Sequence, residues 1–403
     1  MPAAPAPLGL DPYGFAAAHL SAPALACLER LQHVLDTELR PLLPEAWEQA
    51  EMPPAVRPAL ARLRLMDPPG LTPEEAGSSL FSGFRTYLLA RTDVSLATAY
   101  NGQSGLFRTA VAVGGSPEQV RELDPRIRSF ELAGAFALTE PDHGSDIAGG
   151  LATTARRDGE GWVLDGAKRW IGGADAADVI VVFARDTEDG AVRAFLVDRH
   201  APGLEVHVMR GKVALRPVQN AELALTGVRV PESARLQRVD GWGDVARILA
   251  ATRSDVAWIA TGLQAGALDA ALRYAGAREQ FDRPIGAFAL VQEKLARMLG
   301  NLTASLGMVV QLSLRQDAGH VADEESALAK MWTALRARET AALAREILGG
   351  NGLLLEHDAA RFFADAEAVY SYEGTHEITS LIVGRALTGH SAFTSPRPNR
   401  KAS

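Results

Sequence analysis

Residues 158–166, DGEGWVLDG, place a short apolar run between two Asp-Gly pairs. Asp-Gly favours the two-residue turn of a β-hairpin, because that turn needs positive φ angles. Short apolar runs recur around such turns from about residue 131 to 239: Ala133–Leu138, Trp162–Leu164, Val179–Ala184, Arg193–Val197 and Leu223–Leu225, with a further turn at Asp189-Gly190. No long amphipathic helix separates the runs, so we predict an antiparallel β-barrel or sandwich.

Helical patterns flank this β region on both sides. Upstream, residues 16–130 carry apolar side chains at helical spacing. Downstream of Trp242, longer apolar stripes joined by short breaks indicate an antiparallel bundle. The sequence therefore predicts an α+β fold with these parts: an N-terminal helical domain (1–132, of which 1–12 are expected to be disordered), a middle β domain (133–241), a C-terminal four-helix bundle (242–394) and a disordered tail (395–403).

The composition restricts the class of protein. With 403 residues the chain exceeds the ~250–300 at which one hydrophobic core stops growing, so several domains are expected. The net charge of −8 argues against a nucleic-acid binder, and no uninterrupted apolar run reaches the ~20 residues of a membrane span. The single cysteine, Cys27, excludes an intramolecular disulfide and a Cys-cluster metal site. The N-terminus lacks a secretory leader, and we expect a cytoplasmic protein without a bound metal.

Glu373 is the strongest candidate for catalysis. It lies in residues 370–378, YSYEGTHEI, with apolar residues on both sides and Gly374 directly after it. Apolar surroundings disfavour the charged carboxylate, which raises its pKa toward that of a useful general base. The simpler interpretation is a helix start, with Thr375 as N-cap and Glu377 in the first turn. On this stretch alone the simpler interpretation is favoured.

Four further stretches carry candidate binding groups, each with a plainer alternative. Residues 136–146, FALTEPDHGSD, offer hydroxyls and a glycine, or are merely a strand-exit turn. Residues 168–173, KRWIGG, place an indole against a flat cofactor or in the core at a turn. In residues 278–284, REQFDRP, Arg278 binds phosphate or lies on a solvated helix end. The glycines of residues 346–352, EILGGNG, admit a pyrophosphate or only cap a helix.

These five stretches, in this order and on an α–β–α layout, resemble the acyl-CoA dehydrogenase family. The resemblance covers residues 80–393 and rests on LTEPDHGSD, KRWIGG, REQFDRPIG, EILGGNG and YEGTHEI. Within the family, residues 91–104 and the ending GRALTGHSAF resemble the glutaryl-CoA dehydrogenase branch. KRWIGG, LRPVQN, MLGN, RARETA and EILGGNG resemble the short-chain acyl-CoA oxidase of plant peroxisomes.

The resemblance implies an FAD-dependent dehydrogenase that converts an acyl-CoA to trans-2-enoyl-CoA. Glu373 would remove the α-proton while a β-hydrogen leaves as hydride to flavin N5, and an electron-transferring flavoprotein would accept the electrons. The thioester carbonyl would be bound by the Glu373 amide and a flavin ribityl hydroxyl. The implied cofactor-binding residues are Phe136, Leu138, Thr139, Gly144, Ser145, Trp170, Ile171, Gly172, Arg278, Gln280, Phe281, Phe288, Glu346, Gly349, Gly350, Thr375 and Glu377. The implied substrate-binding residues are Ser145, Arg253, Tyr372 and Gly374. Those from Arg278 to Gly350 would reach a neighbouring subunit's FAD, which implies a homotetramer built as a dimer of dimers.

Three features depart from the family pattern. Gly172 and Gly173 stand where relatives usually carry Thr-Asn after Trp-Ile, which leaves room for oxygen or merely for a water. Ala97 stands where glutaryl-CoA enzymes carry the arginine for the distal carboxylate, so a decarboxylating glutaryl enzyme is not expected. Asp255 replaces a small residue two positions after Arg253 and is a candidate partner for that arginine.

Two alternative functions stay open. Gly172 is shared with the plant oxidase type, so an acyl-CoA oxidase that reduces O2 to H2O2 is the first. The second is a DNA-associated flavoprotein of the same fold, against which the presence of Glu373 and the negative net charge both count. The acyl chain length is not predicted, and Leu96, Tyr100 and Leu106 are candidates for the floor of its pocket.

Overall fold

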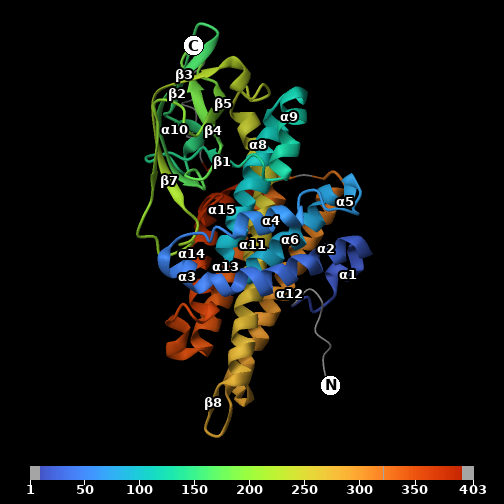
Figure 1. Cartoon of the computed structure of the whole chain (residues 1–403). Helices are drawn as coiled ribbons and strands as arrows, with labels where there is room; N and C mark the ends of the chain where they lie inside the picture. Colours follow the sequence, from blue (N-terminus) through green and yellow to red (C-terminus); the bar gives the residue numbers. More distant parts are fainter. Residues whose placement is uncertain (1–9, 321, 393–403) are drawn as a thin grey trace, which may run out of the picture.

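The computed structural model describes residues 10–320 and 322–392. A β domain forms one end of the molecule, and helices from both ends of the sequence form the rest (Figure 1). The predicted order of helical, β and helical parts is therefore confirmed. None of the helices in the described ranges combines the length and the hydrophobicity of a membrane span.

The N-terminal part consists of short helices and helical turns. They are α1 (Phe15–His19), α2 (Ala22–Val34), η1 (Leu35–Leu39), η2 (Arg40–Leu42), α3 (Leu43–Gln49), α4 (Val56–Leu63), α5 (Pro73–Gly77), α6 (Ser79–Thr92), α7 (Val94–Asn101), η3 (Gly102–Phe107), α8 (Arg108–Gly114) and α9 (Pro117–Arg128). Of the lead-in expected to be disordered, residues 1–9 lie outside the described residues. Asp11 accepts hydrogen bonds from the amides of Phe15 and Ala16, and Leu10 accepts one from the Tyr87 hydroxyl.

The middle part is a seven-stranded sheet with one short helix. Its elements are β1 (Gly134–Ala137), α10 (Ile147–Gly150), β2 (Thr154–Asp158), β3 (Gly161–Gly172), β4 (Val179–Asp186), β5 (Val192–Asp198), β6 (Leu204–Val208), β7 (Asn220–Pro231) and the turn η4 (Glu232–Ala234). The strand order is β1-β4-β2-β3-β7-β6, with β5 paired to β4. Every apolar run that the sequence analysis singled out lies in or overlaps one of these strands.

The sheet is mixed, which corrects the prediction that it is antiparallel. The pairs β2–β3, β3–β7, β4–β5 and β6–β7 are antiparallel, but β1 and β2 both run parallel to β4. β1 pairs with residues 179–182 of β4 and β2 with residues 185–186, so the two strands follow each other along one edge. A loop and α10 join β1 to β2, and the two strands run in the same direction. The residues between them have no periodic apolar pattern, so the sequence did not predict this parallel arrangement.

The Asp-Gly turns are confirmed at two of three places. Gly159 and Gly190 have φ angles of 61° and 74° in the β2–β3 and β4–β5 connections. Asp165-Gly166, predicted as a turn, instead lies within β3, where the pairing register with β7 shifts. Gly166 has a φ of 149°, and a Cβ there would lie 2.6 Å from Oγ1 of Thr153. A glycine in a strand also marks a bulge or a close approach, and here it does both.

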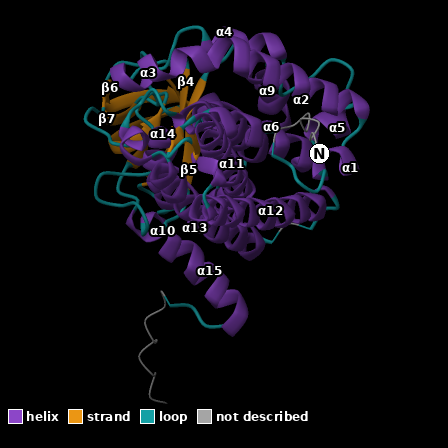
Figure 2. Ribbon diagram, turned by 90° about the horizontal axis from the view of Figure 1, so that it is seen from below, coloured by secondary structure: helices purple, strands orange, loops and turns teal. Residues whose placement is uncertain are grey.

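The C-terminal part is dominated by long helices. Its elements are α11 (Trp242–Ala277), β8 (Glu279–Gln280), β9 (Arg283–Pro284), η5 (Ile285–Ala287), α12 (Ala289–Asp317), α13 (Asp323–Ile347), η6 (Gly349–Leu353), α14 (Asp358–Ser371) and α15 (His376–Thr388). α11 is surrounded by α6, α12, α13 and α14 (Figure 2). The segment from 393 to 403, which contains the tail expected to be disordered, lies outside the described residues.

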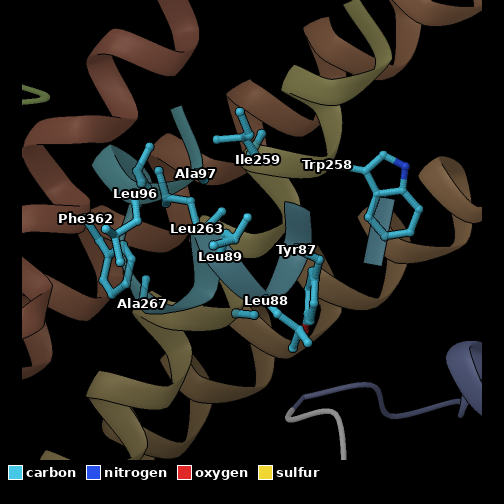
Figure 3. Close-up of a cluster of buried hydrophobic side chains, with 14 of the residues drawn as sticks. Tyr87, Leu88, Leu89, Leu96, Ala97, Trp258, Ile259, Leu263, Ala267 and Phe362 are labelled. Carbon is cyan, nitrogen blue, oxygen red and sulfur yellow. The ribbon is translucent and has the colours of Figure 1, made fainter. Parts of the chain in front are cut away.

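The largest apolar core joins the N-terminal and C-terminal helices. Leu88 and Leu89 from α6 pack with Ile259 and Leu263 from α11 (Figure 3). Two smaller clusters lie in the β domain and between that domain and the helices. The helical parts are therefore one packed body, in which α11 has neighbours on several sides and brings distant segments of the sequence together.

Candidate active site

Glu373 lies in the short loop between α14 and α15, in an unusual backbone conformation. Its φ is 55°, and that of Gly374 is 90°. The left-handed region is costly for a residue with a side chain, and such strain is found mainly where the surroundings fix it for function. Thr375 follows as the N-cap of α15 and accepts a 3.3 Å hydrogen bond from the Ile378 amide. The helix-start interpretation therefore describes Thr375 and Glu377, while Glu373 precedes the helix.

Two side chains from other helices fix this loop. Thr252 of α11 donates a 2.6 Å hydrogen bond to Oε1 of Glu373. Lys330 of α13 is fully buried, and its Nζ donates to the carbonyls of Tyr370, at 3.0 Å, and Gly374, at 2.6 Å. The lysine thus binds the main chain on both sides of Glu373, and the threonine binds the carboxylate itself.

The charges around Glu373 act in opposite directions on its pKa. Burial is the largest effect and raises the pKa above its usual value. The Thr252 hydrogen bond and the positive charges of Arg253 and Lys330 lower it, and the net result is a raised pKa. Lys330 is affected in turn, because burial lowers the pKa of its ammonium group to about 8. A carboxylate with a raised pKa can accept a proton, and the two cations beside it can stabilise a nearby anion.

Of the four residues expected to bind substrate, three lie with Glu373 and one is on another element. Arg253 is buried next to Thr252, and Tyr372 and Gly374 flank Glu373 in the loop. The Tyr372 hydroxyl lies 3.4 Å from that of Thr98, and burial raises its pKa. Ser145 is exposed in the β domain, between β1 and α10.

Asp255 is not the partner that its sequence position suggested. Arg253 forms its ion pair with Asp323, at the start of α13. The charges that act on Asp255 are those of Arg85 and Glu373. Asp323 is 70 residues from Arg253 in sequence, so only the packing of α13 on α11 reveals this pair.

The loop after β1 is held against β3 by a buried ion pair. Lys168 donates to Oε1 of Glu140 at 2.8 Å, and both side chains are almost fully buried. The carboxylate also accepts hydrogen bonds from the amides of Ala152 and Thr153. The Arg169 amide donates to the Thr139 carbonyl at 2.9 Å. These bonds place the segment after β1 beside Trp170 and Ile171.

Trp170 is not a core side chain. It is 53% exposed, has a φ of 67°, and lies where the β3–β7 register shifts. Thr139 is half-buried and Ser145 is exposed on the adjoining loop. An exposed indole beside hydroxyl groups fits a flat, polar heterocycle such as a flavin. The remaining predicted residues of this group are Phe136, Leu138, Gly144, Ile171 and Gly172.

A second group of predicted cofactor residues lies far from the first. These residues occupy the end of the molecule where α11 stops: Arg278, Gln280, Phe281, Phe288, Glu346, Gly349 and Gly350. Figure 1 shows β8 at the opposite end from the β domain. Glu346 accepts a 2.7 Å hydrogen bond from Lys294, near the start of α12. Phe281 is 88% exposed, with a φ of 53° in the β8–β9 turn. Within one chain, the two groups do not meet.

The sequence analysis missed Thr252 and Lys330. Thr252 precedes Arg253, which was named, but a threonine inside a helix gives no sign of its partner. Lys330 lies within a stripe of apolar residues in α13, and a lysine in an otherwise apolar stripe is the indication that was available. Glu140 and Lys168 belong to stretches that were named, although their buried ion pair was not predicted.

Comparison with known proteins identifies the family. Residues 135–228 match the middle domain of acyl-CoA dehydrogenases, and residues 239–388 match their C-terminal domain. A 3-(aryl)acrylate reductase of Clostridium sporogenes is 32% identical over 363 residues, which covers 87% of this chain and 95% of that protein. The mitochondrial short-chain specific acyl-CoA dehydrogenase of Bos taurus is 32% identical over 362 residues, which covers 87% of each chain. A glutaryl-CoA dehydrogenase of Mycobacterium smegmatis, solved in complex with FADH2, superposes with a TM-score of 0.89 at 32% identity and covers 97% of this chain and all of its own. The chain therefore belongs to the acyl-CoA dehydrogenase family of flavin-dependent oxidoreductases.

Proposed function

We propose that the chain dehydrogenates an acyl-CoA to trans-2-enoyl-CoA, with Glu373 as the base that removes the α-proton. The observation that carries this proposal is the position of Glu373 itself. Its side chain extends from a loop with a strained backbone. The carboxylate accepts a hydrogen bond from Thr252 and is buried near Arg253 and Lys330. A base for so weakly acidic a proton needs a raised pKa and little competing water, and burial provides both.

The other groups of the loop support the developing negative charge. Arg253 and Lys330 are buried cations whose charges act on Glu373. Fixed positive charges in a dry site stabilise an enolate-like thioester more strongly than they would in water. Lys330 also holds the carbonyl of Gly374, and so limits the conformations of the segment whose Glu373 amide would bind the thioester oxygen.

FAD is the cofactor, and when bound it supplies the acceptor for the β-hydrogen. Thr139 and Ser145 would bind its polar ring edges, and Trp170 would cover one face. Arg278 and Phe281 would bind the nucleotide part at the other end. Because β8 lies at the end of the molecule away from the β domain that carries Thr139 and Trp170, we infer that a single FAD contacts both groups only when they come from different subunits (Figure 1). This separation supports cofactor sites shared between two subunits, and the homotetramer built as a dimer of dimers is what the family resemblance implies.

We propose an electron-transferring flavoprotein as the electron acceptor, with oxygen as the second candidate. The observation that favours oxygen is the space beside Gly172, which has no side chain to fill it. A Cβ at Gly172 would meet only Asn220 and Val218, both at an ordinary 3.7 Å. The fold therefore accepts a larger residue there, and glycine leaves that space free next to Trp170.

An anaerobic titration with acyl-CoAs of increasing chain length tests the proposed reaction. We expect at least one of them to bleach the absorbance of the bound flavin and to yield the 2-enoyl-CoA. Absence of bleaching with every straight, branched and aromatic acyl-CoA contradicts the proposal. Aerobic mixing then separates the two acceptors, because stoichiometric peroxide release supports the oxidase and reduction of a flavoprotein acceptor without peroxide supports the dehydrogenase.

A further inference from the structure

Asp255 is a polar side chain one helical turn along α11 from Thr252, the residue that binds the proposed base. Thr252, which binds Glu373, and Asp255 are three residues apart and so lie on the same side of α11. From Thr252 to Ala260, Asp255 is the one residue that is not buried, since it remains half-buried. Its carboxylate forms no hydrogen bond or ion pair with any residue that the structure describes. The carboxylate is not sealed from solvent, and no described side chain hydrogen-bonds to it, so it remains open to a polar group of a ligand.

Asn101 presents a second such group at the same place. The residue is only 7% exposed, and its amide forms no hydrogen bond within residues 10–320 and 322–392. A Cβ at Gly105 would lie 2.1 Å from Oδ1 of Asn101 and 2.6 Å from Oδ2 of Asp255. Both side chains therefore approach the same glycine in the helical turn η3. If the amide is rotated so that Asn101 donates to Asp255, the other carboxylate oxygen and the amide oxygen still lack partners.

Arg85 supplies the positive charge next to this pair. Its guanidinium donates to the Leu65 carbonyl and to Ser82, and lies 5.0 Å from the centre of the Tyr100 ring. The Nε of Arg85 is buried and has no partner among the described residues. Arg85 is thus held by the helical domain, where its charge acts on Asp255 without a direct ion pair.

Side chains of α7 form part of the apolar core. Leu96 and Ala97 are fully buried and lie against Leu263 and Phe362 (Figure 3). Ala97, which the resemblance places where glutaryl-CoA enzymes carry an arginine, thus lies in an apolar cluster. The polar side chains near the base lie elsewhere: Arg85 on α6, Asn101 at the end of α7 and Asp255 on α11.

We propose that Asp255 and Asn101 bind a hydroxyl group carried by the acyl chain, so that the preferred substrate is a hydroxylated acyl-CoA. This inference rests on the proposed function. A hydroxyl can donate to the carboxylate and accept from an amide, so it matches both groups. A second carboxylate on the acyl chain would face the negative charges of Asp255 and Glu373, and an ammonium group would face Arg85. A neutral group with both a donor and an acceptor avoids both conflicts.

The helix geometry gives the position of the hydroxyl. Three residues of α-helix rise about 4.5 Å, which is the length of roughly three carbon–carbon links. Thr252 places the α-carbon site of Glu373 beside α11, so an acyl chain that extends along α11 toward Asp255 would bring a carbon about three links further along opposite Asp255. We therefore expect the hydroxyl at or next to C5 of the acyl group.

A comparison of hexanoyl-CoA with 5-hydroxyhexanoyl-CoA tests this inference in the holoenzyme. We expect kcat/KM with an artificial electron acceptor to favour the hydroxylated substrate by about 10-fold or more, mainly through KM. Asp255→Leu should abolish or reverse this preference, and Asp255→Asn, which can still form hydrogen bonds, should retain part of it. Asp269→Asn is the matched control, because Asp269 lies on the same helix and pairs with Arg91 and Arg273. That variant should keep the full preference.

The outcomes separate this inference from the proposed function. If neither substrate bleaches the flavin, and no other acyl-CoA does, the proposed function fails and the inference fails with it. If hexanoyl-CoA is oxidised and the hydroxyl changes kcat/KM by less than 2-fold, the function stands and the inference is wrong. The inference is also wrong if Asp255→Leu retains the wild-type preference, because the hydroxyl would then be bound elsewhere.

Discussion

The hydroxyl of Thr252 donates a 2.6 Å hydrogen bond to Oε1 of Glu373, and so connects the middle of α11 to the loop before α15. A hydrogen bond to the charged carboxylate stabilises it, which opposes the effect of burial on the pKa. The balance between these two effects decides how readily Glu373 accepts a proton.

Thr252→Val should shift the pH dependence of the reaction. The variant keeps the shape of the side chain but removes the hydrogen bond that lowers the pKa of Glu373. The rising limb of kcat/KM against pH, which reports the base in the free enzyme, should move up by about one pH unit. Thr261→Val is the control, because Thr261 is buried on the same helix but bonds only to the Ala257 carbonyl. An unchanged profile in Thr252→Val would show that this bond does not tune the base.

Lys330→Met should affect both the position and the charge of the active-site loop. The variant loses two hydrogen bonds to main-chain carbonyls and one of the cations that lower the pKa of Glu373. We expect kcat to fall by about 10-fold or more and the rising pH limb to move upward. Arg297→Met removes an exposed cation from α12 and should change neither quantity. Equal behaviour of the two variants would contradict the role of Lys330.

Glu140→Gln should destabilise the loop proposed to border the flavin. The substitution leaves Lys168 buried without its charged partner, which costs about 3 kcal/mol. We expect a lower melting temperature and weaker retention of FAD during dialysis. Glu222→Gln is the matched control, because Glu222 pairs on the surface with Arg169, the next residue of β3. The account is wrong if Glu140→Gln binds FAD as tightly as that control.

Asp255→Asn should make the stability of the protein less sensitive to pH. Burial raises the pKa of Asp255 from 3.8 to about 7 in the folded protein. The folded state then binds the proton more tightly than the unfolded state, so the stability from this group is present below pH 4 and lost as the pH rises to 7. The asparagine cannot ionise, so the variant should be more stable than the wild type at pH 8, by about 2 kcal/mol in the free energy of unfolding. At pH 5 the gain over the wild type should be smaller. Melting temperatures at the two pH values test this, and a gain of equal size at both contradicts it.

The sequence predicted the parts of the fold that local patterns determine. The turns at Gly159 and Gly190 follow from Asp-Gly pairs. Glu373 became the candidate base only through the ordered set of five stretches and the resemblance that they carry, because its own stretch favoured a plain helix start. Asp165-Gly166 has the same composition as those turns but lies at a bulge, because the approach of Thr153 decides its role. Local sequence therefore identified the strands, but not every role of a glycine.

Contacts between distant segments were beyond the reach of the sequence. The apolar stripe around Lys330 indicates burial, but only the packing of the helices shows that Lys330 binds the carbonyls of Tyr370 and Gly374. The pairing of Arg253 with Asp323, and the location of Asp255 near Arg85, likewise depend on how the helices pack.

The most direct test of the account is rapid anaerobic mixing of the Glu373→Gln variant with an acyl-CoA that bleaches the wild-type flavin. We predict that the variant binds FAD and the acyl-CoA but bleaches at least about 1,000-fold more slowly, since the amide cannot accept the α-proton. Glu367→Gln, at an exposed glutamate of α14 that pairs with Arg338, should bleach at the wild-type rate. Bleaching of Glu373→Gln at a rate near that of the wild type would contradict the assignment of Glu373 as the base.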